Sequence, residues 1–381
     1  MGTRIRENLL AWGLGLARRF DRRAPDPAEL GTVAIRRILV MSCTAIGDTL
    51  LSTPAIRSLR QRYPQARIVL LVNAPYHGLF ADNPDIDDLI DYHGGYRRFV
   101  RLALALRRER FDLVTILHAN EPQATPLAYL SGARWRFKLP NNSRFRFLLS
   151  NHQQVSNWSD FTHGIDQRLA VAALAGADGC DKHMILPVST QNRDAVAGWL
   201  QQQYGITPQQ PVIGFQVGAS TASRRWRPER YAELAQRLLA ANPSLRIVVT
   251  GSPQERALAD VVADAVNDAR LVVTAGQLPL TRMPALVQRF ACLVTPDTGI
   301  MHMAIAVGTP IVGLFAAAHW HGSGPTTDLQ RHIVIQKHRT CDPCLGKRCK
   351  YAAPPCMDNI TVDEVLAACE RQLSLQPETP Q

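Results

Sequence analysis

The sequence predicts an α/β protein built from two parallel-sheet domains. Short apolar segments of strand length alternate with segments of helical periodicity over residues 36–187, and the same alternation returns over residues 211–340. Such alternation is typical of a parallel sheet covered by helices. The chain has 381 residues, too many for one ordinary core, and a polar, glutamine-rich stretch at 188–210 separates the two regions. We expect that stretch to be a linker.

The charge balance points to an anionic partner. A formal net charge of +11 suits nucleic acid, a phosphorylated small molecule or an acidic membrane surface. No nucleic-acid motif is evident and few basic residues alternate with aromatic ones, so the sequence argues against nucleic acid. Eight cysteines in a chain of this length do not make a disulfide scaffold, and no secretory signal is evident, so we expect a reducing cytoplasm.

Residues 1–35 form an N-terminal extension of different character. Apolar residues recur there at helical spacing, at Ile5, Leu9, Trp12, Leu16 and Phe20. Positive charge comes from Arg4, Arg6, Arg18, Arg19, Arg22 and Arg23. A basic amphipathic helix of this kind can lie on an anionic membrane, where each arginine contributes about 1 kcal/mol. The alternative is a helix that packs on the first domain, and we slightly favour the membrane.

The first domain opens with a buried strand, Ile38 to Met41, and a polar loop that ends in Asp48. Thr53 and Pro54 then begin a helix, because threonine caps helices and proline suits the first helical position. The next elements are a strand, a helix and a strand, at Ile68 to Val72, about 97–109, and Leu113 to Leu117. Parallel sheets bind ligands at the carboxyl ends of their strands, where Asp48 and His118 both fall.

Asp48 has two interpretations. It can cap the helix that follows, or it can accept a proton from a bound hydroxyl. A helix start lowers the pKa of a carboxyl group, so Asp48 would be a weak base, which suffices if the hydroxyl becomes acidic as its bond to carbon forms. The loop has one glycine where a dinucleotide fingerprint has three, and no acidic residue ends the second strand, which argues against a nicotinamide or flavin enzyme.

The second domain repeats the order of strands and helices. Its expected strands are Val212 to Gln216, Ile247 to Thr250, Leu271 to Thr274, Phe290 to Pro296 and Ile311 to Phe315. Its expected helices are Pro228 to about Ala240, about 254–266, 282–288 and Ile300 to Val307. The polar turn Asp297-Thr298-Gly299 offers free amides, and His302 follows one helical turn later. This arrangement indicates a diphosphate site, and the alternative is a capped core helix with an incidental histidine.

Two other loops of this domain carry groups suited to a nucleotide. Ser220, Thr221 and Arg224 precede the helix at Pro228, and hydroxyl and guanidinium groups suit phosphate oxygens. Glu255 follows a strand, where its carboxylate can accept both hydroxyls of a ribose. The alternatives are a solvated loop for the first group and a first-turn helix acid for Glu255.

Three motifs occur in order along the chain: Ala45 to Leu50 with Thr53 to Ile56, Arg224 to Trp226 with Pro228 to Leu234, and Pro296 to Gly299 with His302 to Ala304 and Ala306 to Pro310. Together they resemble glycosyltransferase family 9, the ADP-heptose:lipopolysaccharide heptosyltransferases. The resemblance covers residues 36–370, roughly. The family usually has lysine where this chain has Arg224, and arginine keeps the charge but not the point geometry of an ammonium group.

The resemblance implies a GT-B fold, with an acceptor-side domain and an ADP-sugar-binding domain facing each other across a cleft that closes for catalysis. It implies inverting transfer from ADP-L-glycero-β-D-manno-heptose to a hydroxyl of a lipopolysaccharide inner-core sugar, without an essential metal. Such an enzyme would be cytoplasmic and peripheral on the cytoplasmic face of the inner membrane. A family member with a different donor or acceptor, and a non-catalytic nucleotide-sugar-binding protein, are the alternatives.

The resemblance also implies roles for single residues. Asp48 matches the catalytic base. The residues that match donor contacts are Ser220, Thr221, Arg224, Glu255, Asp297, Thr298, Gly299 and His302. Among these, Thr298 and Gly299 match diphosphate contacts and His302 a supporting phosphate contact. Asp297 matches a contact to the donor heptose, Ser220 and Thr221 the other phosphate loop, and Glu255 the ribose acid.

The tail, residues 341–381, contains four cysteines with the spacing of a four-thiolate zinc site: Cys341, Cys344, Cys349 and Cys356. Similar tails occur in part of the family, and unligated thiols or redox-active bonds are the alternatives to zinc. Thr361 and Glu364 then predict a capping box for a last helix that packs on the protein.

Overall fold

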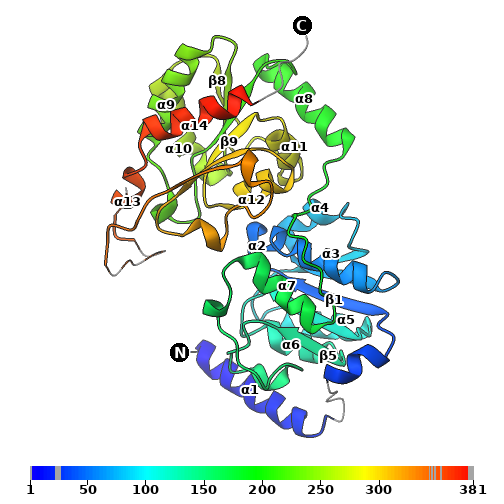
Figure 1. Cartoon of the computed structure of the whole chain (residues 1–381). Coiled ribbons are helices and arrows are strands. Elements are labelled where there is room, and N and C mark those ends of the chain that lie inside the picture. The colour runs from blue at the N-terminus through cyan, green and yellow to red at the C-terminus, as the bar shows by residue number, and fades with distance from the viewer. Residues whose placement is uncertain are drawn as a thin grey trace. The chain divides into compact units, whose positions relative to one another are not determined.

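The chain folds into two compact units, each built on its own parallel sheet (Figure 1). The structure is a computed structural model that describes residues 2–21, 27–342, 344, 346, 349–351 and 354–375. The first unit spans Met1–Ile185 and the second Leu186–Gln381. The predicted α/β class with two parallel sheets is confirmed.

The first unit has a five-stranded sheet with strand order β3-β2-β1-β4-β5, and all neighbouring strands are parallel. The strands are β1 (Arg37–Ser42), β2 (Arg67–Asn73), β3 (Asp88–Tyr92), β4 (Leu113–His118) and β5 (Trp135–Lys138). The chain adds strands first on one side of β1 and then on the other, so the strand order reverses between β1 and β4. Doubly wound sheets bind ligands at this switch point, beyond the carboxyl ends of the strands.

Helices cover both faces of this sheet, since consecutive residues of β1 from Ile38 to Met41 are all fully buried. The helices of the unit are α1 (Gly2–Arg19), α2 (Ile46–Leu50), α3 (Thr53–Arg62), α4 (His77–Phe80), α5 (Phe99–Arg108), α6 (Ala124–Leu130) and α7 (Gly164–Leu174). Residues of α5 and α6 share a core with alternate strand residues such as Leu39 and Val114. α3 and α7 pack on each other, and α7 also packs on β4.

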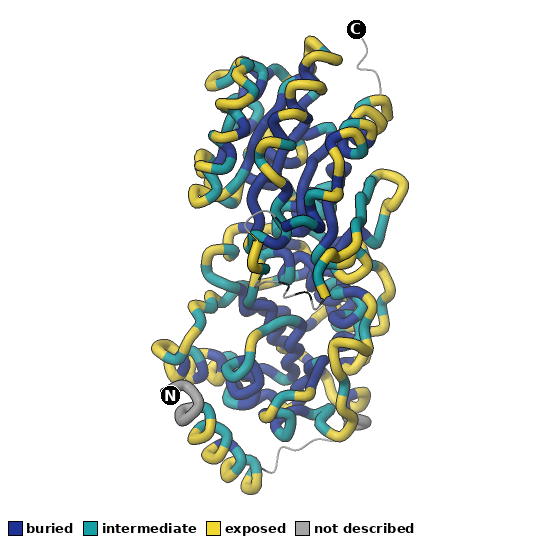
Figure 2. The backbone as a smooth tube through the Cα atoms, turned by 90° about the vertical axis from the view of Figure 1, so that its left-hand side faces the viewer, coloured by how far each residue is buried: buried dark blue, intermediate teal, exposed yellow. Residues whose placement is uncertain are grey.

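Helix α1 has two apolar faces. Its inner face packs on the first unit, where Leu14 is buried against Tyr129, Phe145 and Leu148. The opposite face carries a stripe of large apolar side chains, Leu9, Trp12 and Leu16, which continues to Phe20 just past the end of the helix; these side chains are 45–79% exposed. Figure 2 shows exposed stretches recurring along the backbone of this helix. The packing that we expected as an alternative is therefore present, and it leaves the outer stripe uncovered. Among the residues that the structure describes, no helix is long and apolar enough to cross a membrane.

The second unit has a six-stranded parallel sheet of order β11-β10-β9-β6-β7-β8. Its strands are β6 (Val212–Gln216), β7 (Arg246–Thr250), β8 (Leu271–Val273), β9 (Cys292–Pro296), β10 (Ile311–Phe315) and β11 (Ile333–Gln336). Its helices are α8 (Thr190–Tyr204), α9 (Pro228–Ala241), α10 (Arg256–Val266), α11 (Met283–Gln288), α12 (Gly299–Ala306), α13 (Pro355–Asp358) and α14 (Val362–Ser374). The strand order reverses between β6 and β9, so this sheet has a switch point of its own.

The stretch that we expected as a linker, residues 188–210, contains helix α8. Two residues define its ends. Ser189 caps the start, because its side chain accepts a bond from the amide of Asn192, and Gly205 ends the helix with a left-handed backbone (φ 63°). Gln201, Gln202 and Gln203 are therefore exposed residues of a helix that belongs to the second unit.

The C-terminal helix completes the core of the second unit. Val365, Ala368 and Cys369 of α14 are buried with residues of α9, β9 and β10. The predicted capping box is present, since the Thr361 hydroxyl accepts from the Glu364 amide and the Glu364 carboxylate accepts from the Thr361 amide. The indole of Trp226, fully buried, donates to the Ile360 carbonyl at 3.0 Å.

We predict that Gly214→Ala destabilises the second unit by about 1–3 kcal/mol, because overpacking a filled core forces side chains off their rotamers. A Cβ atom at Gly214 would lie 2.3 Å from the Phe290 ring. The control is Gly198→Ala inside α8, where nothing lies within 4 Å of the new atom. That change should stabilise the unit by up to about 1 kcal/mol. Urea unfolding measures both, and equal effects of the two changes would contradict the packing described here.

Candidate active site

Asp48 lies in the first turn of α2, at the switch point of the first sheet. Its two carboxylate oxygens bind different partners: Oδ2 accepts from the Thr44 hydroxyl at 3.0 Å, and Oδ1 accepts from a guanidinium nitrogen of Arg168 at 3.1 Å. The N-cap residue of α2 is Ala45, so Asp48 is not the cap of this helix. The carboxylate is held on the protein side and its side chain remains 30% exposed.

Arg168 of α7 is a buried cation that orients Asp48. Its side chain is 2% exposed, and its other bonds go to the Ser52 hydroxyl at 3.2 Å and the Gly164 carbonyl at 2.7 Å. Burial lowers the pKa of Arg168 to about 10, against the opposing effect of Asp48. The guanidinium therefore stays charged at neutral pH. Arg168 was not among the predicted site residues, because it follows Asp166 and Gln167 in the helix and nothing in the local sequence marks it as buried.

His118 ends β4 and joins the same network. Its Nδ1 lies 2.6 Å from the Thr44 hydroxyl oxygen and 3.5 Å from Asp48 Oδ2. A hydroxyl has one hydrogen, and Thr44 uses it in the bond to Asp48, so the Thr44 oxygen must accept a hydrogen bond from Nδ1–H of His118. This assigns the tautomer and leaves Nε2 as an acceptor. Burial first, and then the charge of Arg168, lowers the pKa of His118 to about 4, so the ring is neutral at pH 7.

The second predicted site lies at the switch point of the second sheet. β9 ends at Pro296, Thr298 is the N-cap residue of α12, and its side chain makes no capping bond. The Thr298 hydroxyl oxygen is buried and has no hydrogen-bond partner among the described residues. A buried hydroxyl without a partner costs free energy, so a ligand that bonds to it gains affinity. The helix start beside it favours an anionic ligand.

Asp297, Arg224 and His302 surround this helix start. Asp297 is buried, and its Oδ2 lies 3.2 Å from the guanidinium of Arg224, which also donates to the Asp297 carbonyl. Asp297 Oδ1 accepts from the Ser323 hydroxyl at 3.2 Å and lies 3.9 Å from His302 Nε2. The structure thus brings together four of the predicted donor residues. Asp297 and Thr298 lie in the turn between β9 and α12, His302 lies on α12, and Arg224 ends a short turn before α9.

The remaining predicted donor residues lie on neighbouring loops of the same unit. Thr221 shares a hydroxyl contact of 3.0 Å with Ser223, and Ser220 is exposed. Glu255 forms a capping box with Ser252, and its Oε2 accepts from the Ser252 amide at 2.8 Å and from Gln216 at 3.3 Å. The helix-acid interpretation of Glu255 is therefore present in the structure, with Oε1 left beside Gly218.

Comparison with known proteins agrees with these features. The sequence profile of glycosyltransferase family 9 (heptosyltransferase) matches residues 99–353, about two thirds of the chain. The chain belongs to glycosyltransferase family 9. It is 26% identical over 313 residues to lipopolysaccharide heptosyltransferase 2 of Salmonella typhimurium, covering 78% of this chain and 88% of that protein. The resemblance that the three motifs predicted is confirmed.

Solved structures of the family share the fold. The family 9 glycosyltransferase of Veillonella parvula aligns with a TM-score of 0.75 at 24% identity, covering 90% of this chain and 99% of that one. The E. coli ADP-heptose LPS heptosyltransferase II aligns with a TM-score of 0.73 at 24% identity, covering 89% and 98%. The expected GT-B type of two-sheet architecture is confirmed by these neighbours.

The cysteine-rich tail of this family 9 member lines a cavity of about 410 Å³. Cys341, Cys344 and Cys349 are half-buried and Cys356 is buried. Burial raises the pKa of the Cys356 thiol, and nearby Cys349 and Cys344 add to the effect. Within the described part of the chain, which includes all four of these cysteines, no group of three or more histidine, cysteine or acidic side chains is placed to hold a metal ion. The predicted zinc site is therefore not formed by the described thiols.

We predict that the free energy of unfolding of the first unit falls as the pH falls from about 6.5 to about 4. His118 has a folded pKa of about 4 against an ordinary value of 6.5, so the unfolded chain binds the proton first over this range. The loss should reach about 3 kcal/mol. His118→Asn should remove this part of the pH dependence, whereas His183→Asn, at an exposed position of the same unit, should keep it. Denaturant unfolding between pH 4 and 7 checks this, and identical profiles for wild type and His118→Asn would refute it.

Proposed function

We propose that this chain transfers heptose from ADP-L-glycero-β-D-manno-heptose to a hydroxyl of a lipopolysaccharide inner-core sugar, with inversion at the anomeric carbon. The observation that carries the proposal is the Asp48 carboxylate, which a buried arginine holds at the switch point of the first sheet while its side chain stays 30% exposed. The Salmonella relative is named a lipopolysaccharide heptosyltransferase and the E. coli neighbour is named for ADP-heptose, which supports this donor and acceptor.

Asp48 is the base of the proposed reaction. As the acceptor oxygen forms its bond to the anomeric carbon, its proton passes to Asp48 and the bond between that carbon and the diphosphate breaks. One displacement of this kind inverts the anomeric centre. The ion pair with Arg168 keeps Asp48 ionised, which makes it a weak base, and it receives the proton only when bond formation has made the hydroxyl acidic.

The second unit stabilises the leaving ADP. Negative charge develops on the diphosphate as the bond breaks, and groups that are already oriented toward it lower the barrier. In our proposal the Thr298 hydroxyl and the Gly299 amide bind the diphosphate, with Arg224 and His302 beside them. Asp297, held by Arg224, binds the donor heptose. Ser220 and Thr221 form the other phosphate loop and Glu255 binds the ribose. These groups supply base and charge stabilisation without a metal.

A lipopolysaccharide acceptor is anchored in a lipid layer, and helix α1 suits attachment to one. Its outer stripe consists of leucine, tryptophan and phenylalanine, and the helix sequence contains four arginines and one glutamate. Such a helix lies in the interface of an anionic membrane instead of crossing it. We place the protein on the cytoplasmic face of the inner membrane, where the base, donor site and acceptor would share one compartment.

We predict that Asp48→Asn lowers turnover by about 100- to 10,000-fold, the usual contribution of a general base. Affinity for ADP-heptose should stay unchanged, because Asp48 belongs to the first unit and the proposed donor residues to the second. The readouts are ADP release with a core acceptor and calorimetric binding of ADP-heptose. Asp82→Asn, at an exposed position of the same unit, should keep full activity. Full activity of Asp48→Asn would reject Asp48 as the base. If the wild type turned over another nucleotide sugar and not ADP-heptose, the proposed donor would be rejected.

We predict that Trp12→Ser combined with Phe20→Ser reduces binding to anionic vesicles by at least tenfold, since two large apolar side chains then stop entering the interface. Vesicles of phosphatidylglycerol and phosphatidylethanolamine, sedimented with the protein, give the readout. The matched control is Val100→Ser on α5, where another apolar side chain is 69% exposed. Equal vesicle binding by the double variant and the wild type would show that α1 is not the element that attaches the protein to the membrane.

A further inference from the structure

The loop between β5 and α7, residues 139–163, places an aromatic side chain next to the Asp48 network. Trp158 is 52% exposed, at the start of a short turn (Trp158–Asp160). Its ring centroid lies 5.9 Å from that of His118, at an interplanar angle of 56°. His118 bonds to Thr44 and Thr44 bonds to Asp48, so the indole is three contacts from the proposed base.

Polar contacts hold this turn in one conformation. The Asp160 carboxylate accepts from the Asn157 amide at 2.8 Å as part of a capping box between these two residues. It also accepts from the Ser156 hydroxyl at 2.9 Å. Asn142 donates to the Asn157 side chain at 2.8 Å. Farther along the loop, the buried Asn141 side chain donates to the carbonyls of residues 151 and 154. These bonds fix the chain on both sides of Trp158, and its ring is held beside His118 with about half of its surface open to a ligand.

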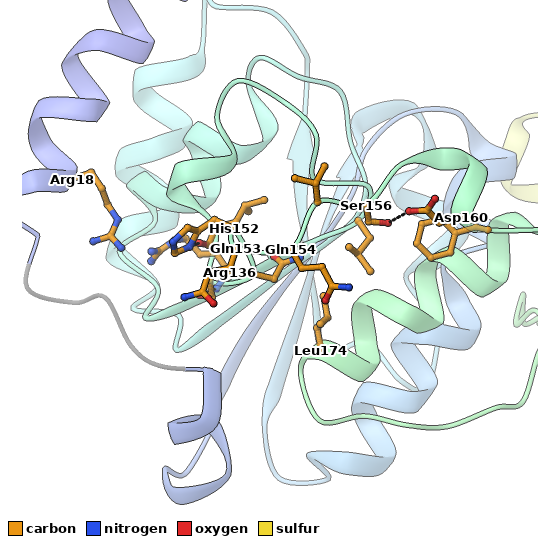
Figure 3. A pocket seen from close by; sticks show the side chains of 14 residues that line it. Arg18, Arg136, His152, Gln153, Gln154, Ser156, Asp160 and Leu174 are labelled. Carbon is orange, nitrogen blue, oxygen red and sulfur yellow. Dashed lines mark hydrogen bonds between the residues drawn. The ribbon is translucent and has the colours of Figure 1, made fainter.

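The same loop borders a cavity of about 880 Å³ in the first unit. Figure 3 shows His152, Gln153 and Gln154 between Arg18 at one end and Ser156 with Asp160 at the other. The lining combines amides, hydroxyls, an imidazole, a carboxylate and two guanidinium groups with five apolar side chains, among them Phe161. A volume of this size is within the range of ligand sites, roughly 300–1,000 Å³. Dense hydrogen-bonding groups beside an aromatic ring suit an oligosaccharide, because sugars have hydroxyl edges and apolar C–H faces.

We infer that Trp158 is the platform on which the reacting acceptor sugar stacks, and that this cavity takes the sugars next to it in the acceptor. The inference rests on the proposed function, since it assigns the acceptor side of that reaction. A hydroxyl presented to Asp48 belongs to a sugar close to His118, and Trp158 is the exposed aromatic group that contacts His118. The loop continues from Trp158 through Ser156 into the cavity, so the rest of the acceptor chain follows the loop.

Trp158→Ala tests the platform with a delipidated core oligosaccharide as acceptor. The KM for this acceptor should rise about tenfold or more, as expected for loss of an aromatic contact worth roughly 1.4 kcal/mol. The KM for ADP-heptose should not change, and Trp158→Phe should restore most of the acceptor affinity. Leu104→Ala removes an apolar side chain of equal exposure from α5 and should change neither value. An unchanged acceptor KM in Trp158→Ala, or equal changes for donor and acceptor, would overturn the inference.

Gln154→Trp tests the cavity, because a larger side chain fills it while the Gln154 backbone carbonyl keeps its bond from Asn141. The variant should raise the KM for acceptors of several sugars and leave the KM for a single-sugar acceptor unchanged. Equal effects on both would reject the cavity as the site of the neighbouring sugars.

Binding of the oligosaccharide to Asp48→Asn, measured by saturation-transfer NMR with and without Trp158→Ala, separates the two proposals. Loss of binding on removal of Trp158 supports the platform even if heptose transfer itself fails. Equal binding refutes the platform and leaves the proposed function intact.

Discussion

The ion pair between Arg168 and Asp48 is the constraint on which the arrangement of the first unit depends. A guanidinium that is 2% exposed has lost most of its hydration, and only a close carboxylate and several oxygen acceptors make that burial tolerable. α7 therefore has to sit where Arg168 reaches both Asp48 and Ser52, and Ser52 in turn bonds to Ser42 at the end of β1. One charged contact thus fixes the register of α7, the loop after β1 and the first helices against each other.

In the second unit the buried charge is negative instead of positive. Asp297 is a buried carboxylate, and Arg224 neutralises it from a loop that is far away in the sequence. In both units an acidic side chain that our proposal assigns to the reaction is held by an arginine, at the switch point of a parallel sheet. The Thr298 hydroxyl differs, because it is buried without a partner and so remains available for a ligand. Fixed charges next to an unsatisfied donor are what a pre-organised anion site requires.

Local chemistry explains which parts were predictable from sequence. The turn at Asp297 to Gly299 and the loop before Asp48 carry their own signals, since proline, glycine and short polar side chains set the ends of strands and helices. Arg168 carries none, because it lies 120 residues from Asp48 and only tertiary packing shows that it is buried beside that carboxylate. The sequence predicted a linker where helix α8 lies, because a glutamine tract is compatible with a linker and with a helix. The ends of this helix depend on the capping geometry of Ser189 and Gly205. The cysteine spacing suggested zinc, yet spacing alone does not bring four thiols to one point.

The bond from Trp226 to the Ile360 carbonyl has a consequence for the order in which the protein matures. Trp226 follows directly on the segment with Ser220, Thr221 and Arg224, and its indole is anchored by the stretch of chain just before α14. Domains made on the ribosome fold as their segments emerge, N-terminal ones first. The first unit can therefore assemble while synthesis is still under way, whereas the loop before α9 in the second unit gains its anchor only after residue 360 has left the exit tunnel.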